Sequence, residues 1–170
     1  MKKLSIGRRI VNGVMRLFGY APNPNGFLAK DYVVPGVLAV ISPTFEMLMV
    51  DWKRIPADSA KTLVGYIYGL SKGIAIYAEL RDPEISFFAA WQTMLKIFPG
   101  REDLIKILHA CQWDDPEVKV GVDLGIDDAA LFLSGSHPVS RLSKILIERH
   151  EEYVLNDDIV RRFYDMEGKK

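Results

Sequence analysis

The stretch "GYIYGLSKG", residues 65–73, places Gly65, Gly69 and Gly73 inside a run that otherwise predicts a helix. Each glycine costs a helix about 1 kcal/mol relative to alanine, so three of them need a structural reason. A spacing of four puts all three on one side of the helix. We therefore expect close packing against this side, by a helix expected at 83–98 or 138–155 or by a second copy of the chain.

The sequence around these glycines predicts one long buried helix at 58–80. Pro56 and Asp58 are typical helix-start residues, and no proline follows before Leu80. Because nearly all the other side chains are apolar or small, this helix belongs at the centre of the fold. The polar exceptions, which form one narrow stripe, are Lys61, Lys72 and Glu79.

Further helices are predicted on either side of residues 114–136. Asp82 and Pro83 mark the start of an amphipathic helix at 83–98, in which apolar residues recur every three or four positions. A shorter helix is expected at 101–113, and a similar apolar pattern predicts a helix at 138–155. The helices at 83–98 and 138–155 are expected to pack against the central one.

Two regions have a less regular pattern. Residues 32–52 contain Pro35 and Pro43 among β-branched and aromatic residues, so either a short β-hairpin at 36–52 or a pair of short buried helices fits them. Residues 118–124 fit a short strand or a loop, and a helical turn is expected to follow at 127–133.

These elements predict a mainly α fold, an irregular single-domain bundle of six or seven helices around the buried helix at 58–80. With 170 residues, the chain is long enough to bury roughly 70% of its unfolded surface in one domain. Its 49% hydrophobic and 26% charged residues are ordinary for a globular protein. We divide the chain into an N-terminal helix at 1–20 and one helical globular domain at 21–170.

The N-terminal segment predicts a basic amphipathic helix. The apolar residues of 3–19 fall within about half of a helical wheel, and Lys2, Arg9 and Arg16 align on the opposite side. Gly19 and the turn sequence "APNPNG" end the helix. Such a helix can bind an acidic protein surface or lie on an anionic membrane. The residues expected to make this contact are Lys2, Lys3, Arg8, Arg9, Arg16 and Phe18.

Charge is distributed unevenly along the chain, although the formal net charge is zero. Residues 1–30 hold six basic and no acidic residues, whereas residues 101–170 hold ten basic and fifteen acidic residues. The zero net charge argues against nucleic acid as a partner, and opposite charges at the two ends favour head-to-tail binding between copies. We therefore expect a homo-oligomer or a complex with another protein.

The sequence contains no catalytic, cofactor or metal motif. The acidic pairs at 114–115, 127–128 and 157–158 each stand where a helix or turn is expected to begin, so we interpret them as helix caps. We expect no metal and no cofactor, and an enzyme is the less favoured hypothesis. Its site would form only in the folded chain, around His137, Glu148 and His150.

The leading hypothesis is a non-enzymatic interaction or assembly subunit that self-associates through the basic N-terminal helix and the acidic C-terminal third. The alternative is a peripheral membrane protein anchored by residues 3–19. The single cysteine, Cys111, fits a reducing compartment, which predicts a cytoplasmic location or the cytoplasmic surface of a membrane. A membrane-spanning helix is not expected, because Glu46 interrupts residues 32–50 and Lys72 interrupts residues 63–80.

Overall fold

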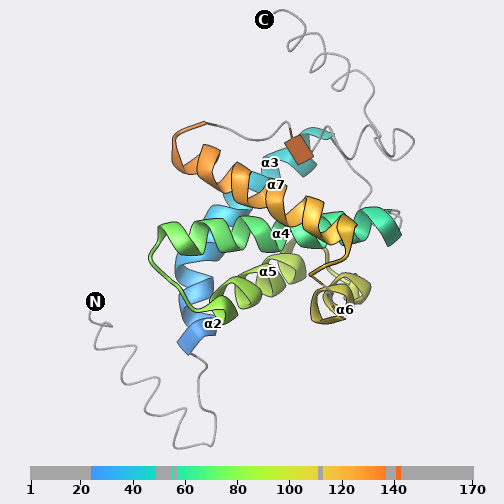
Figure 1. Ribbon diagram of the computed structural model, residues 1–170, viewed down its shortest axis with the longest axis horizontal. Coiled ribbons are helices and arrows are strands. Elements are labelled where there is room, and N and C mark those ends of the chain that lie inside the picture. Colours follow the sequence, from blue (N-terminus) through green and yellow to red (C-terminus); the bar gives the residue numbers. More distant parts are fainter. Residues whose placement is uncertain (1–23, 49–54, 56, 111–112, 137–140, 143–170) are drawn as a thin grey trace, which may run out of the picture.

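The computed structural model describes residues 24–48, 55, 57–110, 113–136 and 141–142, most of which are helical (Figure 1). Five continuous helices run through the described residues, where six or seven were expected for the whole chain, and these residues contain no β-strand. The mainly α fold is therefore confirmed. The helices expected at 3–19 and 138–155 lie outside the described residues, apart from Arg141 and Leu142.

The first helix runs from residue 24 to residue 48 and contains a π-helical turn. The backbone N–H of Val34 donates to the carbonyl of Ala29, five residues back. This wider turn directly precedes Pro35, whose ring would clash with the carbonyl four residues earlier in a regular α-helix. The helix consists of α2 (Pro24–Leu28), the π-helical segment η1 (Ala29–Val33) and α3 (Val34–Leu48).

This helix shows that the β-hairpin considered at 36–52 is wrong. Residues 34–48 are continuously α-helical, and Pro43 lies inside α3. The β-branched residues favour strands in isolation, but here one helical face of them is buried, and tertiary packing overrides propensity. The buried residues of this face are Val33, Val34, Val37, Val40 and Ile41.

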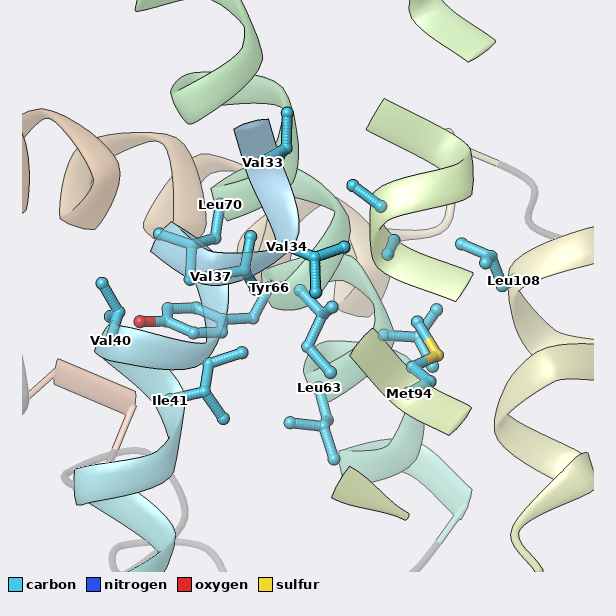
Figure 2. Close-up of a cluster of buried hydrophobic side chains, with 14 of the residues drawn as sticks. Val33, Val34, Val37, Val40, Ile41, Leu63, Tyr66, Leu70, Met94 and Leu108 are labelled. Atoms are coloured by element: carbon cyan, nitrogen blue, oxygen red, sulfur yellow. The ribbon is translucent and has the colours of Figure 1, made fainter. Parts of the chain in front are cut away.

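Helix α4 (Ala57–Tyr77) occupies the centre of the fold and covers most of the range 58–80 that was expected for the buried helix. Figure 1 shows α4 between α7 and α5, with the helix that contains α3 passing behind. Its large side chains join the valines of η1 and α3 in one hydrophobic core (Figure 2). The fully buried side chains that α4 contributes include Leu63, Tyr66, Ile67 and Leu70.

Helices α5 (Pro83–Ile97) and α6 (Glu102–Ala110) extend this core. The side chain of Asp82 caps α5 by accepting a hydrogen bond of 3.0 Å from the backbone N–H of Glu84, and Pro83 occupies the first turn. The start predicted for this helix is therefore confirmed. Met94 of α5 and Leu108 of α6 are buried among the side chains of the core (Figure 2).

Helix α7 (Pro116–Leu133) spans the region where a strand or loop and a helical turn were expected. The strand interpretation of 118–124 is wrong, because the side chain of Asp115 caps one unbroken helix by accepting from the backbone N–H of Glu117 at 3.0 Å. The helix ends at Leu133 and is followed by Gly135, whose positive φ of 88° lets the backbone N–H of Ser136 bond back to the carbonyl of Leu131.

Candidate functional site

Helices α4 and α7 contact each other backbone to backbone. A Cβ atom at Gly65 or Gly69 would overlap the carbonyl oxygen of Val118 or Val122 respectively. A Cβ atom at Gly73 would overlap the side chain of Ala129. Larger residues at these positions would therefore have to push α7 away, which explains why α4 carries three glycines despite their cost.

Helix α7 presents a matching row of small residues. A Cβ atom at Gly121 would overlap the carbonyl of Thr62, and one at Gly125 would overlap the carbonyl of Tyr66. The contacts advance in the same direction along both helices, so α4 and α7 run parallel. We call this contact the glycine seam, formed by Gly65, Gly69, Gly73, Gly121, Gly125 and Ala129.

The helix that faces Gly65, Gly69 and Gly73 is not one of those considered from the sequence. Residues 83–98, residues 138–155 and a second copy of the chain were the expected partners, whereas the structure places α7 there. The signal that could have identified α7 is its own spacing of four, from Gly121 through Gly125 to Ala129.

Polar contacts fix the register of the two helices at their N-terminal ends. The Lys61 ammonium lies 2.8 Å from the Asp115 carboxylate, and the Thr62 hydroxyl donates to the Glu117 carboxylate at 2.9 Å. The hydrogen bond from Lys61 holds the pKa of Asp115 below its usual value. Asp115 therefore both caps α7 and joins it to α4.

A buried polar pair lies farther along the seam. The Tyr66 hydroxyl donates a 2.9 Å hydrogen bond to Oδ2 of Asp128, and both side chains are fully buried. Figure 2 shows the Tyr66 ring beside Val37, Val40 and Ile41, so apolar side chains exclude water on that side. Burial raises the pKa of Tyr66, and burial likewise raises the pKa of Asp128 to about 6.

Arg141 approaches the two neighbouring carboxylates of α7. Its Nη1 atom lies 3.4 Å from Oδ2 of Asp127 and 3.7 Å from Oδ1 of Asp128. The interpretation of this acidic pair as a helix cap is wrong, because both residues lie inside α7. Sequence reasoning missed Asp128, whose role becomes visible only once the seam brings it to Tyr66 of the central helix.

This arrangement gives the fold a buried carboxyl group whose pKa is raised to about 6. Tyr66 and Asp128 are fully buried, so a substrate could not reach them without displacing the core around them. Within the described part of the chain, no three histidine, cysteine or acidic side chains come together in a way that could hold a metal ion. The chemistry that the pair supports is proton binding.

Most of the residues singled out from the sequence lie outside the described residues. Of the three histidines in the sequence, the structure describes His109 of α6, which is exposed with its ring centroid 5.0 Å from that of Phe87. The acidic pair at 157–158 and residues 3–19 are not described. The other candidates outside the description are Lys2, Lys3, Cys111, His137, Glu148 and His150.

The acidic surplus of the C-terminal third falls within the described helices. Residues 101–136 hold three basic and eight acidic residues, whereas residues 137–170 hold seven of each. Asp114 lies just before α7 and Asp123 lies on it, and both are exposed without an ion pair to any described residue. The net charge of −5 therefore belongs to α6, α7 and the chain between them.

Comparisons with protein-family models, with curated proteins and with solved structures found no match. Among the described helices, one segment, Pro24–Pro43, has the length and mean hydropathy (1.2) that a membrane span requires, and 33% of its most apolar window is buried in the fold. Buried helices of soluble proteins meet the same criteria.

Proposed function

We propose that this chain is a non-enzymatic assembly subunit that self-associates, with its basic N-terminal segment binding the acidic surface around α7 of a neighbouring copy. The observation that carries this proposal is the separation of charge. Residues 1–30 have a net charge of +6, and the acidic surplus of −5 lies in residues 101–136. Complementary charged surfaces accelerate and orient association between proteins.

The proposed contact is head to tail, because it joins two different surfaces of the same chain. Such an interface continues from copy to copy unless the geometry closes it into a ring. The exposed residues Asp114 and Asp123 are the acidic partners whose removal should weaken the contact without disturbing the core. Since the charges are exposed, association should weaken as ionic strength rises.

Charge reversal tests the basic side of this contact. Replacing Arg8, Arg9 and Arg16 by Glu should lower the mass in light scattering from that of an oligomer to that of a single chain. The control is Lys96→Glu, which changes an exposed charge on α5. A wild-type chain that is already monomeric at tens of micromolar, or a triple variant with unchanged mass, would overturn the proposal.

A complementary reversal identifies the acidic side. Asp114→Lys combined with Asp123→Lys should also give a single chain, because the basic segment then meets a basic surface. Mixing this variant with the Arg8, Arg9 and Arg16 variant should restore a mixed complex, since each supplies the charge that the other needs. Failure of the mixture to associate, when both variants are folded, would place the interface elsewhere.

A peripheral membrane protein is the second candidate, and two exposed aromatic residues favour it. Phe27 and Tyr32 lie on the helix that follows the basic segment and are 36% and 47% exposed. Aromatic side chains beside basic residues are typical of helices that lie on anionic membranes. Co-sedimentation with phosphatidylserine vesicles, lost on removal of residues 1–20, would support this candidate, whereas binding only between protein chains would exclude it.

A further inference from the structure

The carboxylate of Asp128 is incompletely satisfied in its buried position. Its Oδ2 atom accepts the hydrogen bond from Tyr66, but Oδ1 has no hydrogen-bond partner among the described residues. Among the described residues, the cationic atom paired with Oδ1 is Nη1 of Arg141, at 3.7 Å, which is beyond hydrogen-bonding distance. A buried carboxylate in this state pays a desolvation penalty that its partners offset only in part.

Few titratable groups of the described chain face Asp128. They are Tyr66 from α4, Asp127 from α7 itself, and Arg141 from the short described segment that follows α7. Tyr66 and Arg141 favour the ionised carboxyl, whereas burial and the charge of Asp127 favour the protonated one. The net effect raises the pKa of Asp128 above its usual value, because burial is the largest of these influences.

Arg141 connects this carboxyl to the chain beyond α7. The guanidinium lies between Asp127 and Asp128, and the next residue, Leu142, is buried. Asp127 is exposed, with 69% of its side chain accessible, so water screens its attraction for Arg141. The charge on Asp128 is therefore the less screened of the two attractions that hold Arg141 against α7.

We propose that Asp128 is a proton-controlled switch, which holds Arg141, and with it Leu142, against α7 when it is ionised and weakens that attachment when it binds a proton. The glycine seam contributes to the switch, because the close approach of α4 brings the Tyr66 hydroxyl to Asp128 and buries the carboxyl group. The ligand that changes the state of Asp128 is a proton.

The raised pKa of Asp128 sets the sign of the pH dependence of stability. Burial raises the pKa of Asp128 from 3.8 to about 6, so between these values the folded chain keeps a proton that the unfolded chain has released. The contribution of Asp128 to stability therefore falls as pH rises from about 4 to about 6 and changes little above pH 7. The attraction for Arg141 changes in the opposite direction, since it grows as Asp128 ionises.

The first experiment follows Asp128 directly in the wild-type chain. The ¹³C signal of its carboxyl, recorded by NMR across pH 3 to 8, should titrate near 6, with the methyl signals of Leu142 following the same midpoint. Arg141→Gln should raise that midpoint by roughly 0.5 to 1 unit, because it removes a positive charge that favours ionisation. A midpoint near 4 in the wild-type chain would overturn the proposal.

The second experiment separates the switch from a purely structural role of Arg141. At pH 7.5, Arg141→Gln should lower the equilibrium constant for folding about fivefold, and at pH 4.5 the loss should fall below about twofold. In an Asp128→Asn background, which keeps an acceptor for Tyr66, the effect of Arg141→Gln should be small at both pH values. Equal losses at both pH values in the wild-type background would show that Arg141 acts independently of the proton.

The matched control is Asp127→Asn, which removes the neighbouring carboxylate from the same helix. Because Asp127 is exposed, the difference between pH 7.5 and pH 4.5 in the Arg141→Gln effect should persist in this background. Loss of the difference in the Asp127→Asn background, but not in the Asp128→Asn background, would assign the effect to the exposed carboxylate and contradict the proposal.

Discussion

Two faces of α4 make contacts of opposite kinds. Toward α7, the helix presents Gly65, Gly69 and Gly73, and the backbones of the two helices touch. Toward α3 and α5, it presents large aliphatic side chains, which interlock with the valines of α3 and with Met94 (Figure 2). One helix therefore combines a contact in which backbones meet at glycines and a contact made almost entirely of large side chains.

The two contacts stabilise the fold in different ways, one by burying apolar side chains and the other by bringing two helix backbones close together. The aliphatic face gains free energy from the apolar area it removes from water, about 25 cal/mol per Å². At the glycine seam, the close approach of the two helices allows contacts between backbones and brings Tyr66 to Asp128. We expect the aliphatic face to tolerate substitution by side chains of similar volume, and the glycine seam to tolerate almost no added volume.

The largest effect is expected for added volume at the centre of the seam. Gly69→Leu should lower the free energy of unfolding by about 4 kcal/mol or more, because the atoms it meets belong to the backbone of α7 and cannot rotate aside. Even Gly69→Ala should be clearly destabilising, despite the better helix propensity of alanine. Chemical denaturation monitored by circular dichroism measures the free energy of unfolding of both variants.

Gly36→Ala is the matched control for the seam, because it makes the same change on the aliphatic side. A Cβ atom at Gly36 would lie 3.1 Å from Cδ1 of Ile74, the flexible end of a side chain. This variant should therefore stay within about 1 kcal/mol of the wild type. If Gly69→Ala lowered the free energy of unfolding no more than Gly36→Ala does, the two faces of α4 would not differ in their tolerance of added volume.

A smaller effect is expected for removed volume on the aliphatic face. Met94→Ala should cost about 3 kcal/mol, since Met94 is only 1% exposed and its loss leaves a cavity between α4, α5 and α6. Met94→Leu should cost less than about 1.5 kcal/mol, because leucine fills nearly the same volume. A severe loss for Met94→Leu in thermal unfolding would show that this face is as demanding as the seam.

The smallest effect is expected at positions where the backbone conformation favours glycine and no close helix packing requires it. These positions sharpen the comparison between the two faces of α4. Glu79 follows α4 with a positive φ of 59°, and the backbone N–H of Leu80 bonds back to the carbonyl of Ala75 at 2.9 Å. Glu79→Gly should raise the free energy of unfolding by up to about 1 kcal/mol. Gly135→Ala, at the equivalent position after α7, should lower it by a similar amount. Unchanged melting temperatures for both would contradict this account.

The sequence predicted α4 and α5 because their signals are local. Asp82 and Pro83 mark the start of α5, and the uninterrupted apolar run marks α4 as buried. The same start signal, an acidic cap followed by proline and glutamate, recurs at Asp115, Pro116 and Glu117. At this second position the signal is obscured, because the glycines and valines that follow have low helix propensity on their own.

The buried pair could not be predicted from local pattern. Asp128 follows Asp127 in a stretch that resembles a helix cap, and Tyr66 lies 62 residues earlier in the chain. Their contact depends on the distance between two helix axes, which the seam sets and no single segment encodes. Local pattern does not predict η1 either. Proline is expected to break a helix, but the π-helical turn beside Pro35 keeps this one continuous.

The parallel course of α4 and α7 has a consequence for the order of folding. Parallel neighbours cannot be joined by a short turn, so the chain passes through α5 and α6 before α7 can dock, and Gly65 meets Val118 across 53 residues. We therefore expect contacts that close such long loops to form later than those between α4 and α5, which are neighbours in sequence. During synthesis, α7 cannot cover the glycine side of α4 until the ribosome has released it.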